Sequence, residues 1–117
     1  MSENYSIESK DGVTIVRFFK EPEVIDICDS IDDVAKNYPT ALRLTDLSCG
    51  VNLSSDEIKL VGEYGKFKFS VPSKLAIVAS DDFSFGLSRV FNVHREEKYV
   101  DQGVFRSEEE AMLWLKK

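Results

Sequence analysis

The chain has 117 residues, of which 43% are apolar and 31% are charged, a composition that is typical of one globular domain and excludes a disordered tail or a membrane span. Its 21 acidic and 15 basic side chains give a net charge of −6, which repels phosphate backbones, so we expect no nucleic-acid partner. No N-terminal stretch joins basic residues to a long apolar run, and no segment approaches the roughly 20 apolar residues of a membrane helix, so we expect a cytoplasmic protein without membrane insertion.

Strand and helix patterns alternate along the chain after an opening hairpin, which is indicated by segments of alternating polarity on either side of Asp11-Gly12. Strands are expected at residues 5–9, 13–18, 41–47, 74–79 and 103–106, and helices are expected to begin after Pro22, near Ser55, at Asp81-Asp82 and at Ser107. This order, ββαβαβαβα, predicts a single α/β domain over residues 1–117, with a mixed, mainly parallel sheet, an N-terminal hairpin and four helices.

The spacing of apolar residues also predicts which helix faces are buried. The residues expected to face inward are Ile58, Val61 and Tyr64 in the second helix and Phe83, Leu87, Val90 and Phe91 in the third. Gly86 is expected to let another part of the chain approach the third helix closely. The charged stretch at residues 94–102 is expected to be a loop.

Four segments of the chain resemble the SpoIIAA-like family of small bacterial proteins. They are residues 44–48, 74–82, 85–91 and 104–111, the last followed by Trp114-Leu115, and the match runs from about Ile7 to Leu115. The resemblance implies the STAS fold of anti-sigma-factor antagonists, with a distant likeness to CRAL-TRIO lipid-transfer domains. Because a fold hosts many functions, it implies a regulatory or protein-interaction module without naming the partner.

Ser54 and Ser55 are candidates for a phosphorylation switch, because antagonists of this type carry a phosphorylated serine before the second helix. The matching region keeps the serine pair but lacks the Asp before it and the Gly after it. A simpler interpretation is a capping box, in which Ser54 and Glu57 satisfy the first amide groups of the helix. A phosphate there would gain from the helix dipole and would be repelled by Asp56 and Glu57.

The sequence offers little catalytic machinery, so we expect no enzyme, no cofactor and no metal site. His94 is the only histidine, Cys28 and Cys49 lack the paired spacing of a zinc site, and the glycines form no phosphate-binding motif. Asp46, Asp81 and Asp82 lie at the ends of expected strands and could gather at one sheet edge, but helix capping and a loop hydrogen bond explain them more simply.

A surplus of aromatic side chains in and after the second and third helices points to an apolar groove or contact surface. The candidates are Tyr64, Phe67, Phe69, Phe85 and Phe91. Phe83 and Phe85 lie two residues apart and cannot share one buried helix face, so we expect Phe85 to point toward the second helix, a partner or solvent. Two functions follow: a regulatory module that binds a protein partner or another copy of itself, or a carrier or sensor of a small apolar or lipid-like ligand held between these helices.

Overall fold

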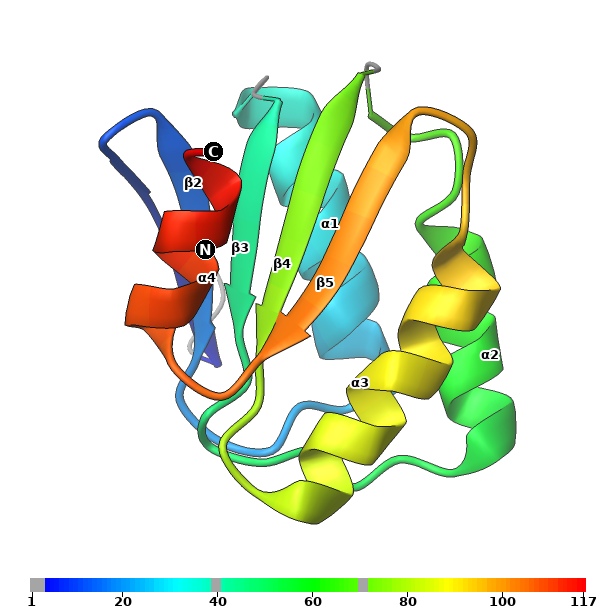
Figure 1. Cartoon of the computed structure of the whole chain (residues 1–117). Coiled ribbons are helices and arrows are strands. Elements are labelled where there is room, and N and C mark those ends of the chain that lie inside the picture. Colours follow the sequence, from blue (N-terminus) through cyan, green and yellow to red (C-terminus); the bar gives the residue numbers. More distant parts are fainter. Residues whose placement is uncertain (1–3, 39–40, 70–71) are drawn as a thin grey trace.

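The computed structural model, which describes residues 4–38, 41–69 and 72–117, has the predicted order of elements (Figure 1). The elements are β1 (Tyr5–Lys10), β2 (Val13–Phe18), α1 (Val24–Asn37), β3 (Leu42–Asp46), α2 (Ser55–Tyr64), β4 (Ser73–Val78), α3 (Asp82–Arg95), β5 (Val100–Phe105) and α4 (Glu108–Leu115). The prediction of an α/β fold with a five-stranded mixed sheet and four helices is therefore confirmed for the described residues.

The strands lie in the sheet in the order in which they occur in the chain, β1-β2-β3-β4-β5. β1 and β2 form the antiparallel hairpin, whose turn residues Asp11 and Gly12 have φ values of 53° and 81°, the left-handed pair that a tight hairpin needs. The other neighbours are parallel, and Leu44 pairs with Ile15 on one side and Ala76 on the other. No helix in the described parts of the chain combines the length and the apolar character that crossing a membrane requires.

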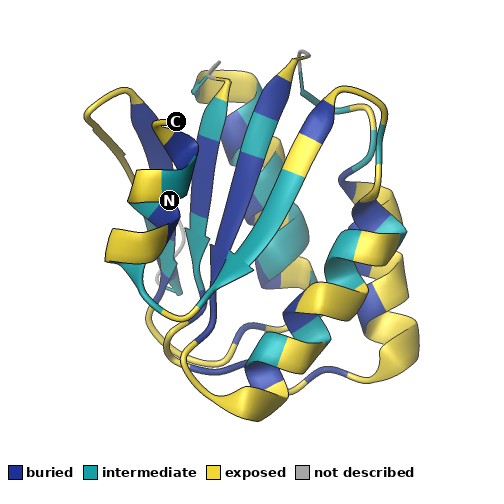
Figure 2. Cartoon of the chain, viewed as in Figure 1, coloured by how far each residue is buried: buried dark blue, intermediate teal, exposed yellow. Residues whose placement is uncertain are grey.

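Helices cover both faces of the sheet. α4 packs on β3, β4 and β5, where Ala111 and Leu115 join a cluster with Ile15, Leu44 and Ala76. α1, α2 and α3 contribute to a second cluster on the opposite face. Figure 2 shows that the helices are buried along their inward sides and exposed along their outward sides, as the amphipathic patterns predict.

α2 packs chiefly on α3 and α1 and lies outside them relative to the strands (Figure 1). Its contact with α3 is direct because Gly62 has no side chain: a Cβ atom there would lie 2.8 Å from the Cβ atom of His94 and 3.2 Å from the carbonyl oxygen of Phe91. At Gly86, by contrast, a Cβ atom would meet nothing within 4 Å. The close approach expected at Gly86 is therefore wrong, and Gly62 provides the close contact instead.

The buried face of α3 also differs from the prediction. Ser84, Ser88 and Arg95 are buried, whereas Phe83 is 60% exposed and Val90 is also exposed. The first turn sets this orientation, because Asp81 accepts a hydrogen bond from the Ser84 amide and the Ser84 hydroxyl accepts one from the Val51 amide, both at 2.8 Å. The expected inward faces were thus wrong at Phe83 and Val90, whereas Leu87 and Phe91 do pack against the core.

The charged stretch at residues 94–102 is not a long loop. α3 continues to Arg95 and β5 begins at Val100, so only residues 96–99 connect them. β5 begins early because Val100 pairs with Ser73 at the start of β4, and this backbone pairing outweighs the polar composition. In α2, Ile58 and Val61 are buried as predicted, but Tyr64 is exposed.

Candidate functional site

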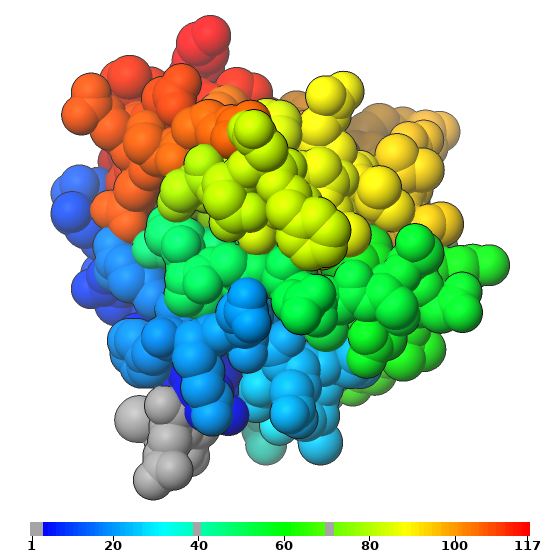
Figure 3. All heavy atoms as spheres, turned by 90° about the horizontal axis from the view of Figure 1, so that it is seen from below, coloured from blue at the N-terminus to red at the C-terminus, as the bar shows by residue number. Residues whose placement is uncertain are grey.

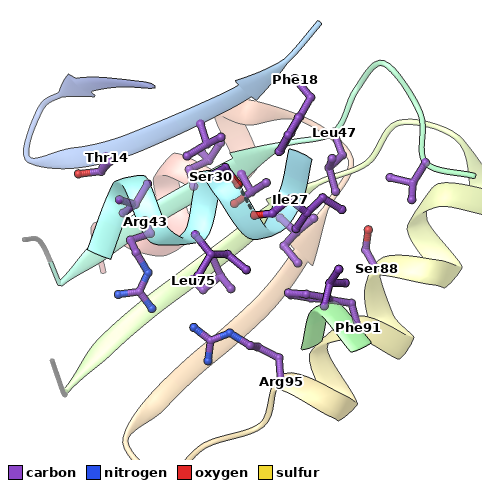
Figure 4. A pocket seen from close by; sticks show the side chains of 18 of the residues that line it. Thr14, Phe18, Ile27, Ser30, Arg43, Leu47, Leu75, Ser88, Phe91 and Arg95 are labelled. Atoms are coloured by element: carbon purple, nitrogen blue, oxygen red, sulfur yellow. Dashed lines mark hydrogen bonds between the residues drawn. The ribbon is translucent and has the colours of Figure 1, made fainter. Parts of the chain in front are cut away.

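A cavity of about 70 Å³ lies between the sheet and the helices α1, α2 and α3. Its lining residues come from β2, β3 and β4, from α1, α2 and α3, and from the segments between them (Figure 4). The walls are mainly apolar. The apolar lining residues belong to the strands, to the three helices and to the segments that connect them: Val16, Phe18, Ile27, Ile31, Val34, Leu44, Leu47, Val51, Ile58, Val61, Phe69, Leu75, Ile77 and Phe91. The polar residues of the lining are Thr14, Ser30, Arg43, Thr45, Ser88 and Arg95.

Two arginines form one end of this cavity. Arg43 lies near the start of β3 and Arg95 at the end of α3, so both occupy the edge of the sheet at which the parallel strands begin. Figure 4 shows both guanidinium groups at the end of the cavity that is remote from Phe18 and Leu47. Arg43 is only 4% exposed and Arg95 only 1%. The cavity therefore has an apolar end and a cationic end.

Burial changes the acid–base properties of both guanidinium groups. It lowers the pKa of Arg43 to about 10, and the nearby charge of Arg95 acts in the same direction. It also lowers the pKa of Arg95 to about 10. Both shifts have the sign expected for cations taken out of water, because desolvation disfavours the charged form. At neutral pH both groups remain protonated.

Phe69 and neighbouring groups hold the two arginines in place. The guanidinium carbon of Arg43 lies 3.9 Å from the centre of the Phe69 ring and that of Arg95 lies 5.6 Å from it, distances typical of cation–π contacts. Arg95 also forms a buried ion pair with Glu97. Gly65 makes room for this arrangement, since a Cβ atom there would lie 2.5 Å from Nε of Arg95.

The two chain segments next to the arginines have strained backbones. Phe67, between α2 and β4, has a φ of 63°, and Tyr99, between α3 and β5, has a φ of 69°. Such values are rare for bulky side chains and occur preferentially near binding sites. Glu97 joins the segments, because it accepts a hydrogen bond from the Phe67 amide at 2.8 Å while it pairs with Arg95.

Ser88 places a hydroxyl group on the wall formed by α3 (Figure 4). The side chain is 3% exposed, and its Oγ atom has no hydrogen-bond partner among the described residues. Ser30, on the facing helix α1, donates to the carbonyl oxygen of Ile27 at 2.7 Å. A buried hydroxyl without a partner costs free energy, so Ser88 is a group that a bound molecule could satisfy.

The candidate aromatic residues do not form one groove. Phe69 and Phe91 line the cavity, whereas Tyr64, Phe67 and Phe85 do not. Tyr64 donates a hydrogen bond to Asp32 on the outer surface, and Phe67 is 85% exposed. Phe85 is half-buried beneath Arg106, whose guanidinium carbon lies 4.2 Å from the ring centre. α2 and α3 touch directly, so the cavity lies beneath them against the sheet and α1.

The two candidate serines lie at the exposed start of α2. Ser54 is the N-cap, and its hydroxyl accepts a hydrogen bond from the Glu57 amide at 3.2 Å. The Glu57 carboxylate in turn accepts one from the Ser54 amide at 2.9 Å. The predicted capping box is thus confirmed. Ser55 is the first residue of the helix, and its side chain is exposed.

The carboxylates after the strands also have structural roles. Asp46 accepts hydrogen bonds from the amide and hydroxyl of Ser48, Asp81 caps α3, and Asp82 pairs with Arg106 at 2.8 Å. Figure 3 shows this edge, where the segments that lead into α1, α2 and α3 lie side by side. In the described ranges no three histidine, cysteine or acidic side chains are placed to hold a metal ion. Cys28 and Cys49 are free thiols, and burial raises the pKa of each.

Sequence reasoning did not identify Arg43, Ser88 or Arg95 as residues of a site. One signal was available for Arg43, a charged residue between the apolar Leu42 and Leu44 in the middle of an expected strand. Another was the spacing of Ser88 and Arg95, which lie seven residues apart and therefore on one helix face. Comparisons with protein-family models, with curated proteins and with solved structures found no match to this chain.

Proposed function

We propose that this protein binds a small ligand with an apolar body in the cavity between the sheet and α1, α2 and α3, as a carrier or sensor. The observation that carries the proposal is the cavity itself, whose apolar walls surround the unpartnered hydroxyl of Ser88. Apolar walls with a few convergent polar groups are the usual composition of small-molecule sites. At about 70 Å³ the space is roughly half that of an engineered cavity of about 150 Å³ that binds benzene, so the bound part of the ligand is small.

Binding without turnover fits the chemistry of the lining. The polar groups supplied by Thr14, Ser30, Thr45 and Ser88 are hydroxyls, and Arg43 and Arg95 supply guanidinium groups. Hydroxyls and guanidiniums bind and orient a ligand, but neither is a general base near neutral pH. The proposed role is therefore that of a carrier or sensor, in which the ligand is held and released unchanged.

The test is a titration with 1-pentanol followed by NMR of the methyl groups that line the cavity. Wild-type protein should show saturable shifts confined to the cavity methyl groups. Ser88→Val removes the unpartnered hydroxyl and narrows the space with a methyl group, so it should fold and weaken these shifts. Ser55→Leu, a change of the same residue type at an exposed helix position, should retain them. Absence of saturable shifts in the wild type with every small apolar or amphipathic probe would refute the proposal.

A second candidate function is protein interaction, and one observation favours it. Phe83, Val90 and Val93 lie on the outward side of α3 and are each more than 40% exposed, so the helix carries an apolar stripe. A partner that co-purifies with the wild type and with Ser88→Val, but not with Val93→Asp, would support this function. If the partner is lost from Ser88→Val and not from Val93→Asp, its binding depends on the cavity and not on the apolar stripe.

We also propose, from the four segments described above, that the chain is a SpoIIAA-like protein with a STAS-type fold, of bacterial origin and cytoplasmic location. The observed ββαβαβαβα order is compatible with this assignment. A regulatory phosphorylation at Ser54 or Ser55 belongs to the same proposal. Both side chains are exposed, and a phosphate on Ser54 would disrupt its bond to the Glu57 amide. Phosphopeptide analysis of the protein from its own host tests it.

A further inference from the structure

We infer that two copies of this chain associate through the outward face of α3, with the two helices antiparallel and a two-fold axis at Gly86. The inference rests on the second candidate function, protein interaction through α3, and not on the cavity. It is carried by an apolar strip and a row of charges on this face, each of which complements a reversed copy of itself. Figure 2 shows that α3 lies on the outside of the molecule and exposes the side turned away from the core.

The middle of this face is apolar. Phe83, Val90 and Val93 are 60%, 41% and 67% exposed, and Gly86 between them is also exposed. At about 100° per residue these four positions fall within about 80° of the helix circumference, so they form one continuous strip. Apolar residues that gather on one exposed face, unlike those scattered singly over a surface, mark an interaction site.

Charged side chains follow one edge of the strip at intervals of seven residues. They are Asp82, Arg89 and Glu96, and all three are exposed. Asp82 pairs with Arg106 at 2.8 Å, but its side chain is 96% exposed, so the carboxylate is accessible to a second cation. Because the sign of the charge alternates along the row, a reversed copy can bring Asp82 of each chain to Arg89 of the other.

A two-fold axis at Gly86 aligns the apolar and the charged residues together. Phe83 lies three residues before Gly86 and Val90 four residues after it, so in the antiparallel pair their heights differ by one residue, about 1.5 Å. Asp82 lies four residues before the axis and Arg89 three after it, which gives the same small difference. The symmetry sets the charged edge against the other charged edge, and every contact occurs twice.

Gly86 lets the two helices approach closely at the axis. A Cβ atom there would meet nothing within 4 Å, so the missing side chain serves no close contact within the chain. Because glycine weakens a helix relative to alanine, a glycine at this exposed position points to a contact outside the chain. Helical side chains lean toward the N-terminus, so Phe83 of one chain would lie over Val90 and Val93 of the other.

The charges favour a second copy over an unrelated protein. An unrelated partner needs only an apolar surface, whereas opposite charges at matching distances on the two sides of Gly86 suit a copy related by a two-fold axis. The contact is small, because the 14 residues of α3 extend only about 21 Å, which places it at the small end of specific interfaces. The dimer should therefore be weak, and the chain should be monomeric in dilute solution.

The test is sedimentation velocity of the full chain over a wide range of concentration. It is done at physiological ionic strength, which screens the long-range repulsion between two chains of net charge −6. Wild-type protein should show a monomer–dimer equilibrium. Val90→Asp should weaken dimerisation at least about tenfold, because it places an unpaired charge opposite Phe83. Leu113→Asp is the matched control, since Leu113 is 67% exposed on α4, across the sheet from α3, and this variant should dimerise as the wild type does.

Two charge variants test the antiparallel orientation. Arg89→Glu alone places an acid opposite Asp82 twice, and Asp82→Lys alone places a base opposite Arg89 twice, so each should dimerise at least about tenfold more weakly than the wild type. A mixture of the two variants should associate about as tightly as the wild type, because both contacts between unlike chains are then attractive. Circular dichroism of each variant alone verifies that it remains folded.

The inference is overturned if the wild type is monomeric at every concentration, or if Val90→Asp weakens the dimer no more than Leu113→Asp does. It is also overturned if neither charge variant alone is weakened, or if their mixture does not associate. Protein interaction through α3 still stands in these cases when a partner from the host is lost with Val93→Asp. A monomeric wild type together with a Val93→Asp chain that retains every partner overturns both proposals.

Discussion

Replacing Gly62 by alanine should destabilise the fold, whereas the same replacement at Gly86 should stabilise it. Both glycines lie inside helices, where alanine is preferred over glycine by about 1 kcal/mol. The difference lies in what the added methyl group meets. At Gly62 it would lie 2.8 Å from the His94 side chain and 3.2 to 3.3 Å from the backbone of α3, whereas at Gly86 it would meet nothing within 4 Å.

The size of each effect follows from these distances. Overpacking against a neighbouring backbone costs about 1–3 kcal/mol, which exceeds the helical gain, so Gly62→Ala should lose about 1 kcal/mol or more of unfolding free energy. Gly86→Ala should gain about 0.5–1 kcal/mol because only the helical preference acts. Urea denaturation followed by circular dichroism measures both. Equal stabilities for the two variants would show that α2 and α3 are not in the close contact described above.

Three further outcomes are expected. Ser54→Ala should lower the unfolding free energy by about 1 kcal/mol and Ser55→Ala by much less, because only Ser54 caps α2; equal urea midpoints would contradict the cap. Phe85→Ser should cost more stability than Phe83→Ser, because Phe83 is largely exposed and Phe85 packs beneath Arg106; the reverse order in denaturation would show that α3 is rotated. Burial and a hydrogen bond to a carboxylate of α1 raise the pKa of Tyr5, so the unfolded chain loses this proton near pH ~10 while the folded chain keeps it. Stability should therefore fall as pH rises above about 10, and Tyr5→Phe should show a shallower fall in the same pH series.

The order of elements was predictable because local signals determine it. The Asp11-Gly12 turn, the capping box at Ser54 and the alternation of apolar strands with amphipathic helices each act within a few residues. The chain order of the strands within the sheet and their mainly parallel pairing follow from short crossovers between neighbours. These parts of the fold need no knowledge of distant contacts.

The buried face of α3 was not predictable in the same way. The pattern of large apolar residues favoured a face with Phe83 and Val90, but the helix turns Ser84, Ser88 and Arg95 inward. The hydrogen bond from the Val51 amide to Ser84 joins residues that are 33 positions apart in the sequence, so the local spacing of apolar residues cannot predict it. The polar part of the cavity depends on the same long-range contacts, so Arg43, Ser88 and Arg95 were missed, whereas Phe69 and Phe91 were among the predicted residues.

Around the proposed site the chain has small and polar residues at positions where a core would normally have leucine or phenylalanine. Gly62 and Gly65 let α2 approach α3 and Arg95, while Ser88 leaves volume and an unpartnered hydroxyl above the sheet. Each choice lowers stability relative to a filled apolar core, because a void forfeits contacts and a buried polar group loses water. Departures from good packing that coincide at one place are expected at functional sites, where stability is given up for binding. If the cavity had no function, Ser88→Val would only improve the core, so a variant that is more stable and binds 1-pentanol more weakly is the outcome that separates a binding site from a packing defect.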